Sequence, residues 1–330
     1  MQPLKLREMR RRIDQVMKNL VKLSTTMETT DCAIFYEWEY DDDFVEIVSN
    51  GMKLQNISSR VFRAGEFPTL LKKVEREEIF FRAVIDRASD ADETCAAIVS
   101  NLIGSGSYVV NDPAGILHAS DKASMHLEFI TAGIFVPYTI IISPYSAQKE
   151  VRLSIGELAK LGRPFIIKPA NTTGGGVGVV MGAEGLQEVI ETRQHHKNDK
   201  YLLQSRVEPA ILDGRRAWFR PFYVFGKILT CWWDDQTHIY FEATEKEISE
   251  YRLEEIERIV SRIYQVCRLD FFSTEIALTA EGKFIVIDYV NEMCDMRVKS
   301  KHYDGVPDNI VEAVGDRVAV GLRGLLEEAQ

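Results

Sequence analysis

The sequence predicts an α/β lobe followed by α+β lobes. Over roughly the first hundred residues, short apolar runs alternate with helical patterns, as in lobes built on a mainly parallel sheet. In the C-terminal half, apolar runs meet in pairs at glycine turns, which is typical of antiparallel hairpins. The length of 330 residues exceeds one average domain and fits two or three lobes.

Residues 1–115 are predicted to form an N-terminal helix and an α/β lobe. Apolar residues from Leu6 to Leu23 fall at helical spacing, and the other face of this helix is basic. Ser89, followed by acidic residues, is expected to begin a helix that ends near Gly104. In chain order we expect strands at 32–38 and 44–48, a helix at 67–75, a strand at 79–85 and the helix at 89–104.

Residues 116–203 and 204–330 are predicted to form a central and a C-terminal lobe. Asp121 is expected to cap a helix with Lys122 in its first turn. The inner face of this helix is expected to carry Ala123, Leu127 and Ile130. Further on, we expect strands at 137–143, 165–168, 177–181, 201–204, 217–225, 228–233, 271–278 and 283–288, with helices at 155–161, 185–193, 256–267 and from 308 onward.

Composition excludes several classes of protein. A net charge of −10 argues against a general nucleic-acid binder, which needs excess Lys and Arg facing phosphates. Five scattered cysteines without a C-x-x-C pair indicate reduced thiols in a cytoplasmic protein. The N-terminus lacks the apolar core of a signal peptide, and the most apolar stretch, 129–142, is too short to span a membrane. We therefore expect a soluble, cytoplasmic protein; its basic N-terminal helix leaves a homodimer open.

A glycine-rich stretch between two predicted strands indicates a phosphate-binding flap. It contains Gly174, Gly175, Gly176 and Gly178, and glycine lets backbone N–H groups approach phosphates closely. The stretch is followed by neither Lys-Ser nor Lys-Thr and opens no helix, so it is neither a P-loop nor a dinucleotide fingerprint. Taken alone, the stretch is a weak signal and favours an ordinary glycine turn without a ligand.

Charged residues near this stretch strengthen the interpretation. Lys168 ends an otherwise apolar strand, where a lysine needs an anionic partner, and Lys122 is a second cation for a polyphosphate. Glu275, Asp288 and Asn291 lie on or just beyond a predicted hairpin. Carboxylate and amide oxygens suit Mg²⁺.

Several motifs then follow one another in a consistent order. They are N-D-P…D-K…G-I-F-V-P-Y-T, F-I-I-K-P-A-N-T-T-G-G-G-V-G-V, Y-L-L-Q-S-R-V-E, R-P-F-Y-V-F-G-K-I and E-I-A-L…F-I-V-I-D-Y-V-N. This order resembles the ATP-grasp family over about residues 79–291, and most nearly its carboxylate–amine ligases of the ribosomal-protein glutamate ligase type. The resemblance implies a pre-ATP-grasp α/β lobe and two α+β lobes that enclose ATP.

The resemblance also implies roles for individual residues. Lys122 and Lys168 would contact the nucleotide phosphates, and Gly174, Gly175, Gly176 and Gly178 would form the closing loop. Gln204, Ser205, Arg206 and Val207 match the hinge that binds adenine, with Glu208 on the ribose. Glu275, Asp288 and Asn291 match the magnesium ligands, and Arg220 an arginine near the acyl phosphate.

Two features depart from the family pattern. The last carboxylate and asparagine are usually spaced E-x-N, whereas this chain has D-Y-V-N, which requires a bulge or a strand end between Asp288 and Asn291. The usual Pro-Gly turn after the asparagine is replaced by residues 292–301. In this segment Arg297, Lys299 and Lys301 could receive a carboxylate or phosphate, or form an exposed basic loop.

The function expected from the resemblance is a Mg²⁺-dependent ligase that uses ATP. Such an enzyme activates a small-molecule or peptide carboxylate as an acyl phosphate and joins it to an amine or a thiol. Two alternatives stay open at this stage. One is a small-molecule kinase on the same scaffold, which the basic segment 292–301 would favour. The other is a nucleotide-binding regulatory protein without turnover, to which the altered D-Y-V-N spacing points.

Overall fold

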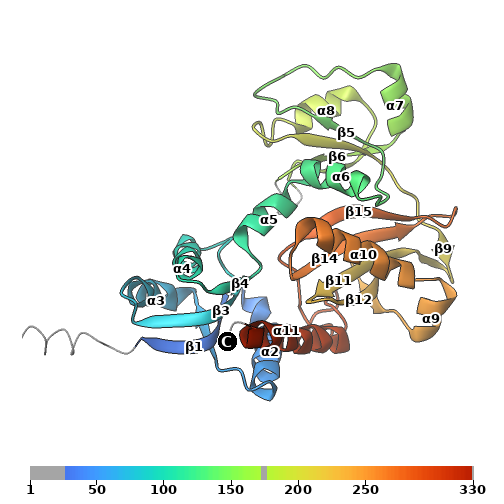
Figure 1. The fold of residues 1–330 in the computed structure, drawn as a ribbon. Coiled ribbons are helices and arrows are strands. Elements are labelled where there is room, and N and C mark those ends of the chain that lie inside the picture. Colours follow the sequence, from blue (N-terminus) through green and yellow to red (C-terminus); the bar gives the residue numbers. More distant parts are fainter. Residues whose placement is uncertain (1–26, 172–176, 329–330) are drawn as a thin grey trace, which may run out of the picture. The chain divides into compact units, whose positions relative to one another are not determined.

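The computed structural model describes residues 27–171 and 177–328. The predicted N-terminal helix lies outside the described residues. The chain divides into two compact units, one of Met1–Glu37 with Ser58–Tyr108, and one of Trp38–Ile57 with Val109–Gln330. Figure 1 shows the elements coloured along the chain. The lobe boundaries expected after residues 115 and 203 stay predictions.

The first unit is built on a parallel sheet, as the sequence predicts. The sheet has the order β2-β1-β3-β4, and β1 pairs in parallel with both β2 and β3. Four phenylalanines, Phe35, Phe62, Phe67 and Phe81, meet edge to face in its core. The elements are β1 (Glu28–Tyr36), β2 (Ser59–Arg63), a 3-10 turn (Ala64–Glu66), α3 (Phe67–Glu75), β3 (Ile79–Arg87), α4 (Glu93–Gly104) and the first residue of β4 (Tyr108–Val110).

Two predictions for the N-terminal half are wrong in detail. The strand expected at 44–48 is part of helix α2 (Asp42–Leu54), which follows a 3-10 turn (Glu39–Asp41). Its buried Phe44, Val48 and Met52 recur every four residues, so the apolar run follows a helical period that a five-residue window cannot distinguish from a strand. The helix expected from Ser89 begins at Glu93, because Asp92 caps it by accepting a hydrogen bond from the Cys95 N–H.

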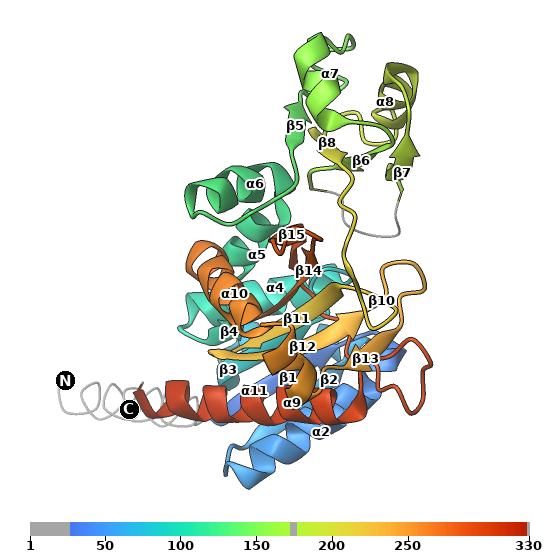
Figure 2. The ribbon, with the colours of Figure 1, turned by 90° about the vertical axis from the view of Figure 1, so that its right-hand side faces the viewer.

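The second unit contains two antiparallel sheets, visible in both ribbon views (Figures 1 and 2). One has the order β5-β8-β6-β7 and the other β13-β12-β11-β14-β15. The first comprises β5 (Thr139–Ile142), β6 (Phe165–Pro169), β7 (Val180–Ala183) and β8 (Tyr201–Ser205), and the second β11 (Trp218–Val224), β12 (Lys227–Trp233), β13 (Tyr240–Glu242), β14 (Phe271–Leu278) and β15 (Phe284–Asn291). Both hairpins expected in the C-terminal half are therefore present.

Helices and a short ribbon complete this unit. The helices are α5 (Pro113–Ser120), α6 (Lys122–Thr131), α7 (Ile155–Leu161), α8 (Leu186–Thr192), α9 (Glu245–Glu250), α10 (Glu254–Cys267) and α11 (Asp308–Glu328), and the ribbon pairs β9 (Ile211–Leu212) with β10 (Arg215–Arg216). Most of the predicted helices lie within a few residues of these bounds. Among the described residues, no helix is both long and apolar enough to cross a membrane.

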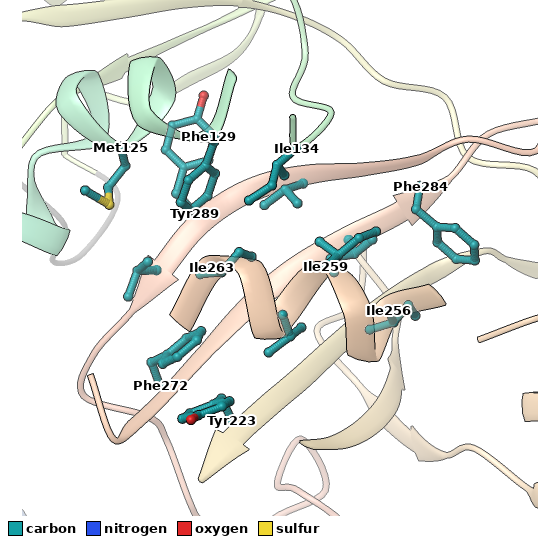
Figure 3. Close-up of a cluster of buried hydrophobic side chains, with 14 of the residues drawn as sticks. Met125, Phe129, Ile134, Tyr223, Ile256, Ile259, Ile263, Phe272, Phe284 and Tyr289 are labelled. Atoms are coloured by element: carbon teal, nitrogen blue, oxygen red, sulfur yellow. The ribbon is translucent and has the colours of Figure 1, made fainter. Parts of the chain in front are cut away.

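The core of the second unit lies where α6 and α10 meet the larger sheet. Figure 3 shows Met125 and Phe129 of α6 near Tyr289 of β15, with Ile259 and Ile263 of α10 in the same cluster. The inner face predicted for α6 is correct for Ala123 but wrong for Leu127 and Ile130, which are exposed. The prediction followed apolar residues only, whereas the buried face of α6 also contains Lys122 and His126.

Helix α11 packs so closely at Gly321 that a side chain there would clash. A Cβ atom on Gly321 would lie 2.2 Å from the ring of Phe225, in the two-residue turn between β11 and β12. Gly324, one turn further along the same helix, has no neighbour within 4 Å of a Cβ.

We expect opposite effects from alanine at these two glycines. Gly321→Ala should destabilise the protein by about 1–3 kcal/mol, because the ring of Phe225 must move. Gly324→Ala should stabilise it by up to about 1 kcal/mol, because alanine favours the helix. Urea unfolding of both variants measures the difference, and a Gly321→Ala variant as stable as Gly324→Ala would contradict this packing.

The buried His126 makes stability depend on pH. Burial, assisted by the nearby Lys168, lowers the pKa of His126 from 6.5 to about 4. The folded protein therefore keeps this imidazole neutral, while the unfolded chain binds a proton below pH 6.5. The stabilisation is complete above that pH and is lost as the pH falls towards 4, by at most about 3 kcal/mol.

His126→Asn should remove this component of the pH dependence. Unfolding midpoints of the wild-type protein and the variant, measured between pH 7 and pH 5, give the comparison. The wild-type midpoint should fall more steeply with acidification. Equal slopes would show that the His126 imidazole does not stay neutral in the folded protein.

Candidate active site

Two adjoining cavities lie within the second unit, with volumes of about 270 Å³ and 250 Å³. Both sheets contribute to their walls. The residues that line both cavities are Ile166, Met181, Gln204, Trp218, Asp235 and Ile287. The two cavities are therefore parts of one continuous site, of the size that ligand pockets usually have.

Both predicted lysines line the larger cavity. Lys122 follows the N-cap Asp121 of α6, and its backbone N–H donates to Ala170 O, the residue after β6. The Nζ atom of Lys168 donates to Ile287 O at 3.2 Å and lies 3.9 Å from Asp288. Burial lowers the pKa of Lys168, and Lys122 lowers it further, while Asp288 opposes the shift. Two ammonium groups thus share one partly buried cavity, which favours an anionic ligand.

The predicted metal ligands also meet at this cavity. Glu275 on β14 pairs directly with Asp288 on β15, and Asn291 pairs with Ser273. The register shifts on both sides of the Glu275–Asp288 pair, because β15 has one extra residue in each interval. The bulge that the D-Y-V-N spacing requires is therefore present. In a regular strand, residues three apart point to opposite faces. The bulge turns the side chains of Asp288 and Asn291 to the same face, and both line the cavity.

The two carboxyl groups differ in their protonation. Burial raises the pKa of Glu275, and Asp288 raises it further, while Arg220 opposes the shift. Burial would also raise the pKa of Asp288, but Lys168, Lys122 and Arg220 together lower it. Asp288 is thus the more acidic member of the pair.

The donor set fits a hard cation. In the part of the chain that the structure describes, no group of three His, Cys, Asp or Glu side chains gathers to form a complete metal site. Glu275 and Asp288 provide two carboxylates, and Asn291 provides an amide oxygen. Mg²⁺ takes only a few protein oxygens of this kind and completes its shell with phosphate and water.

Arg220 lies behind Glu275 rather than on the cavity wall. Its Nη1 atom is 3.3 Å from Glu275 Oε1, and its guanidinium lies 5.2 Å from the centre of the Trp233 ring. Burial would lower the pKa of Arg220, but Tyr240 and the nearby carboxylates raise it. Arg220 is therefore a permanent cation that holds Glu275. Its contact with an acyl phosphate stays a prediction.

The predicted hinge lines the smaller cavity. Gln204, Ser205, Arg206 and Val207 all contribute to its wall as the chain leaves β8. Glu208 lines neither cavity and instead pairs with Arg206 at 2.7 Å and with Arg216 at 3.7 Å. The predicted ribose contact of Glu208 therefore has no support in this geometry.

The glycine stretch is only partly described. Gly174, Gly175 and Gly176 lie outside the described residues. Gly178 has a φ of +77°, and a Cβ there would lie 2.8 Å from the Tyr201 hydroxyl and 3.0 Å from the His196 ring. This position thus needs glycine both for its backbone and for its close contacts.

The basic residues of segment 292–301 all have partners within the protein. Arg297 pairs with Asp295 and Asp304, and Lys301 pairs with Asp43. Lys299 donates to Tyr240 O at 2.6 Å. None of the three lines either cavity, so the suggestion that they receive a substrate anion is not supported.

The sequence did not single out several cavity residues. Trp218, Trp233, Asp235 and His238 line the larger cavity. Trp218 shares its strand face with Arg220 and donates from Nε1 to Glu275 Oε2 at 3.3 Å. Because Trp218 and Arg220 are two residues apart on one strand, the sequence could have placed Trp218 on the same face as Arg220. Asp235 and His238 lie in the loop after β12, where no periodic pattern indicates which way the side chains point.

Comparisons with known proteins give structural relatives only. No protein-family model matches the sequence, and no curated protein sequence does. Among solved structures, the D-alanine–D-alanine ligase of Bacillus anthracis in complex with ATP is 14% identical with a TM-score of 0.60, covering 91% of this chain and 99% of the ligase.

Two further structures are similarly related. The ATP-grasp ligase PsnB, in complex with minimal precursor, Mg and ADP, is 15% identical with a TM-score of 0.58, covering 88% of this chain and 98% of PsnB. A RimK-domain ATP-grasp protein from Sphaerobacter thermophilus DSM 20745 is 15% identical with a TM-score of 0.59, over the same shares of the two chains. These similarities extend over most of the chain. The chain therefore has the ATP-grasp fold.

Proposed function

We propose that this protein is an ATP-dependent ligase that needs Mg²⁺, activates a carboxylate as an acyl phosphate and joins it to an amine or a thiol. One observation carries the proposal. Lys122, Lys168, Glu275, Asp288 and Asn291 come from separate segments and line one cavity. A polyphosphate with its divalent cation complements this combination of charges. The solved ATP-grasp relatives include complexes with ATP and with Mg and ADP.

The nucleotide would lie along both cavities. Gln204, Ser205, Arg206 and Val207 would contact the adenine in the smaller cavity. Lys122 and Lys168 would contact the phosphates in the larger one. The glycine stretch that begins beyond residue 171 is proposed to close over these phosphates and exclude water. Glu208 is left out of this assignment because it lines neither cavity.

Glu275, Asp288 and Asn291 would hold Mg²⁺ through their side-chain oxygens. The bound ion would offset negative charge on the transferring phosphoryl group. Asp288, whose pKa is lowered, provides a carboxylate without releasing a proton near neutral pH. Arg220 and Trp218 fix the Glu275 carboxylate, so this ligand is held in place before the nucleotide binds.

The first reaction step is a phosphoryl transfer. A carboxylate oxygen of the substrate attacks the γ-phosphorus, the bond from that phosphorus to the bridging oxygen breaks, and ADP leaves with its electron pair. Lys168 and Lys122 would stabilise the charge on the phosphoryl oxygens during this step. The product is an acyl phosphate.

The second step forms the new bond. The amine nitrogen attacks the acyl carbon, phosphate departs with the electrons of the C–O bond, and the amine loses a proton. The PsnB relative was solved with a precursor peptide, and the D-alanine–D-alanine ligase is named for D-alanine, so both peptide and small-molecule carboxylates are candidate substrates.

The proposal predicts a specific requirement for product formation. ADP and free phosphate should be released with Mg-ATP only when both a carboxylate and an amine are present. A coupled ADP assay over amino acids and peptides, offered singly and in pairs, tests this requirement. Phosphate retained on a single substrate would instead identify a kinase. No ADP from any pair would favour a binding protein without turnover.

Removing the Lys168 ammonium group should slow turnover strongly. Lys168→Ala is expected to lose on the order of 10²–10³ in kcat, the scale seen when one preorganised donor to a transition state is removed. Lys227→Ala, at an exposed position at the start of β12, is the matched control and should keep full activity. Unchanged turnover in Lys168→Ala would remove this lysine from the mechanism.

A further inference from the structure

Tyr289 is the first of the two residues that separate the proposed metal ligands Asp288 and Asn291 in the D-Y-V-N motif. Its side chain is fully buried and points away from the cavity that Asp288 and Asn291 line. The ring packs edge to face on Phe129, as Figure 3 shows, and the Lys168 ammonium lies 5.2 Å from the ring centre. Tyr289 thus contacts the core on one side and a cavity lysine on the other.

The hydroxyl of Tyr289 belongs to a short chain of hydrogen bonds. It accepts from Gln204 Nε2 at 3.1 Å and lies 2.7 Å from His126 Nδ1. Gln204 Nε2 also donates to Thr139 Oγ1 at 3.3 Å. Gln204 is fully buried and lines both cavities, so this chain reaches the wall where we propose that adenine binds.

These contacts determine which way the Gln204 amide faces. Thr139 Oγ1 donates to Pro137 O at 3.0 Å and is also a hydrogen-bond partner of Tyr289. With its hydrogen on Pro137 O, Thr139 Oγ1 is an acceptor for Gln204. Tyr289 accepts from the same amide nitrogen, and with the His126 proton on Nε2 its own hydrogen goes to His126 Nδ1. The remaining polar atom, Gln204 Oε1, is buried and has no hydrogen-bond partner among the described residues.

We propose that Tyr289 is a positioning residue: held by His126, it keeps the Gln204 amide from flipping, so that a carbonyl oxygen is offered to the nucleobase. A carbonyl accepts from the amino group of adenine and repels the carbonyl that guanine has at the same position. Tyr289 therefore links the nucleobase wall to the metal-binding strand. This inference rests on the proposed ATP-binding function.

The test compares the affinities for Mg-ATP and Mg-GTP, measured by titration calorimetry. In Tyr289→Phe the ring stays and the hydroxyl is lost, so the Gln204 amide keeps only its 3.3 Å hydrogen bond to Thr139 Oγ1 and flips more readily. We expect the preference for ATP over GTP to fall roughly threefold to tenfold, the equivalent of one hydrogen bond. Tyr223→Phe is the control, because Tyr223 is buried and stacks on Tyr264 and Phe272 away from both cavities. Its nucleotide preference should not change.

A pair of substitutions at His126 provides an independent test. His126→Asn keeps an acceptor for the Tyr289 hydroxyl and should keep the wild-type preference. His126→Leu removes the acceptor, frees the hydroxyl to donate to Gln204 Oε1 and should reduce the preference as Tyr289→Phe does. An unchanged preference for ATP over GTP in both Tyr289→Phe and His126→Leu would overturn this inference but leave the proposed function standing. A wild-type protein that binds neither nucleotide would overturn the proposed function as well.

Discussion

The site depends on charges that the protein gathers and only partly neutralises. Lys122 and Lys168 approach each other closely enough for one to lower the pKa of the other, and Asp288 is their main counter-charge. Glu275 forms an ion pair with Arg220 and accepts a hydrogen bond from Trp218. Gathering like charges in a partly buried cavity lowers stability unless a ligand completes the set. A polyphosphate would balance the lysines, and a divalent cation would balance the carboxylates.

The backbone of β15 makes this gathering possible. A regular strand would direct Asp288 and Asn291 to opposite faces of the sheet, because they are three residues apart. The register shifts bring both to the cavity while Tyr289 turns into the core. The altered motif is thus compatible with the usual arrangement of ligands, and the hydrogen bonds of Tyr289 to Gln204 and His126 tie the irregular segment to α6 and β8.

Much of the fold could be predicted from the sequence, because hairpin turns and helix caps are local signals. Asp121 caps α6 as expected, and β14 has the predicted bounds. The prediction of a strand at 44–48 is wrong because the helical period of this segment becomes visible only over the longer stretch to Met52. In the site, strand-end residues such as Lys168 could be predicted. Loop residues such as His238 could not, and the internal partners of Arg297 depend on contacts with no sequence periodicity.

The central claim is that one site offers its cations to a chain of phosphates. The most direct measurement is the affinity of the wild-type protein for AMP, ADP and ATP, each titrated with and without Mg²⁺. The charge arrangement predicts that affinity rises with each added phosphate and that Mg²⁺ strengthens the binding of ATP most. Equal affinities for AMP and ATP, or no binding of any nucleotide at millimolar concentration, would contradict it.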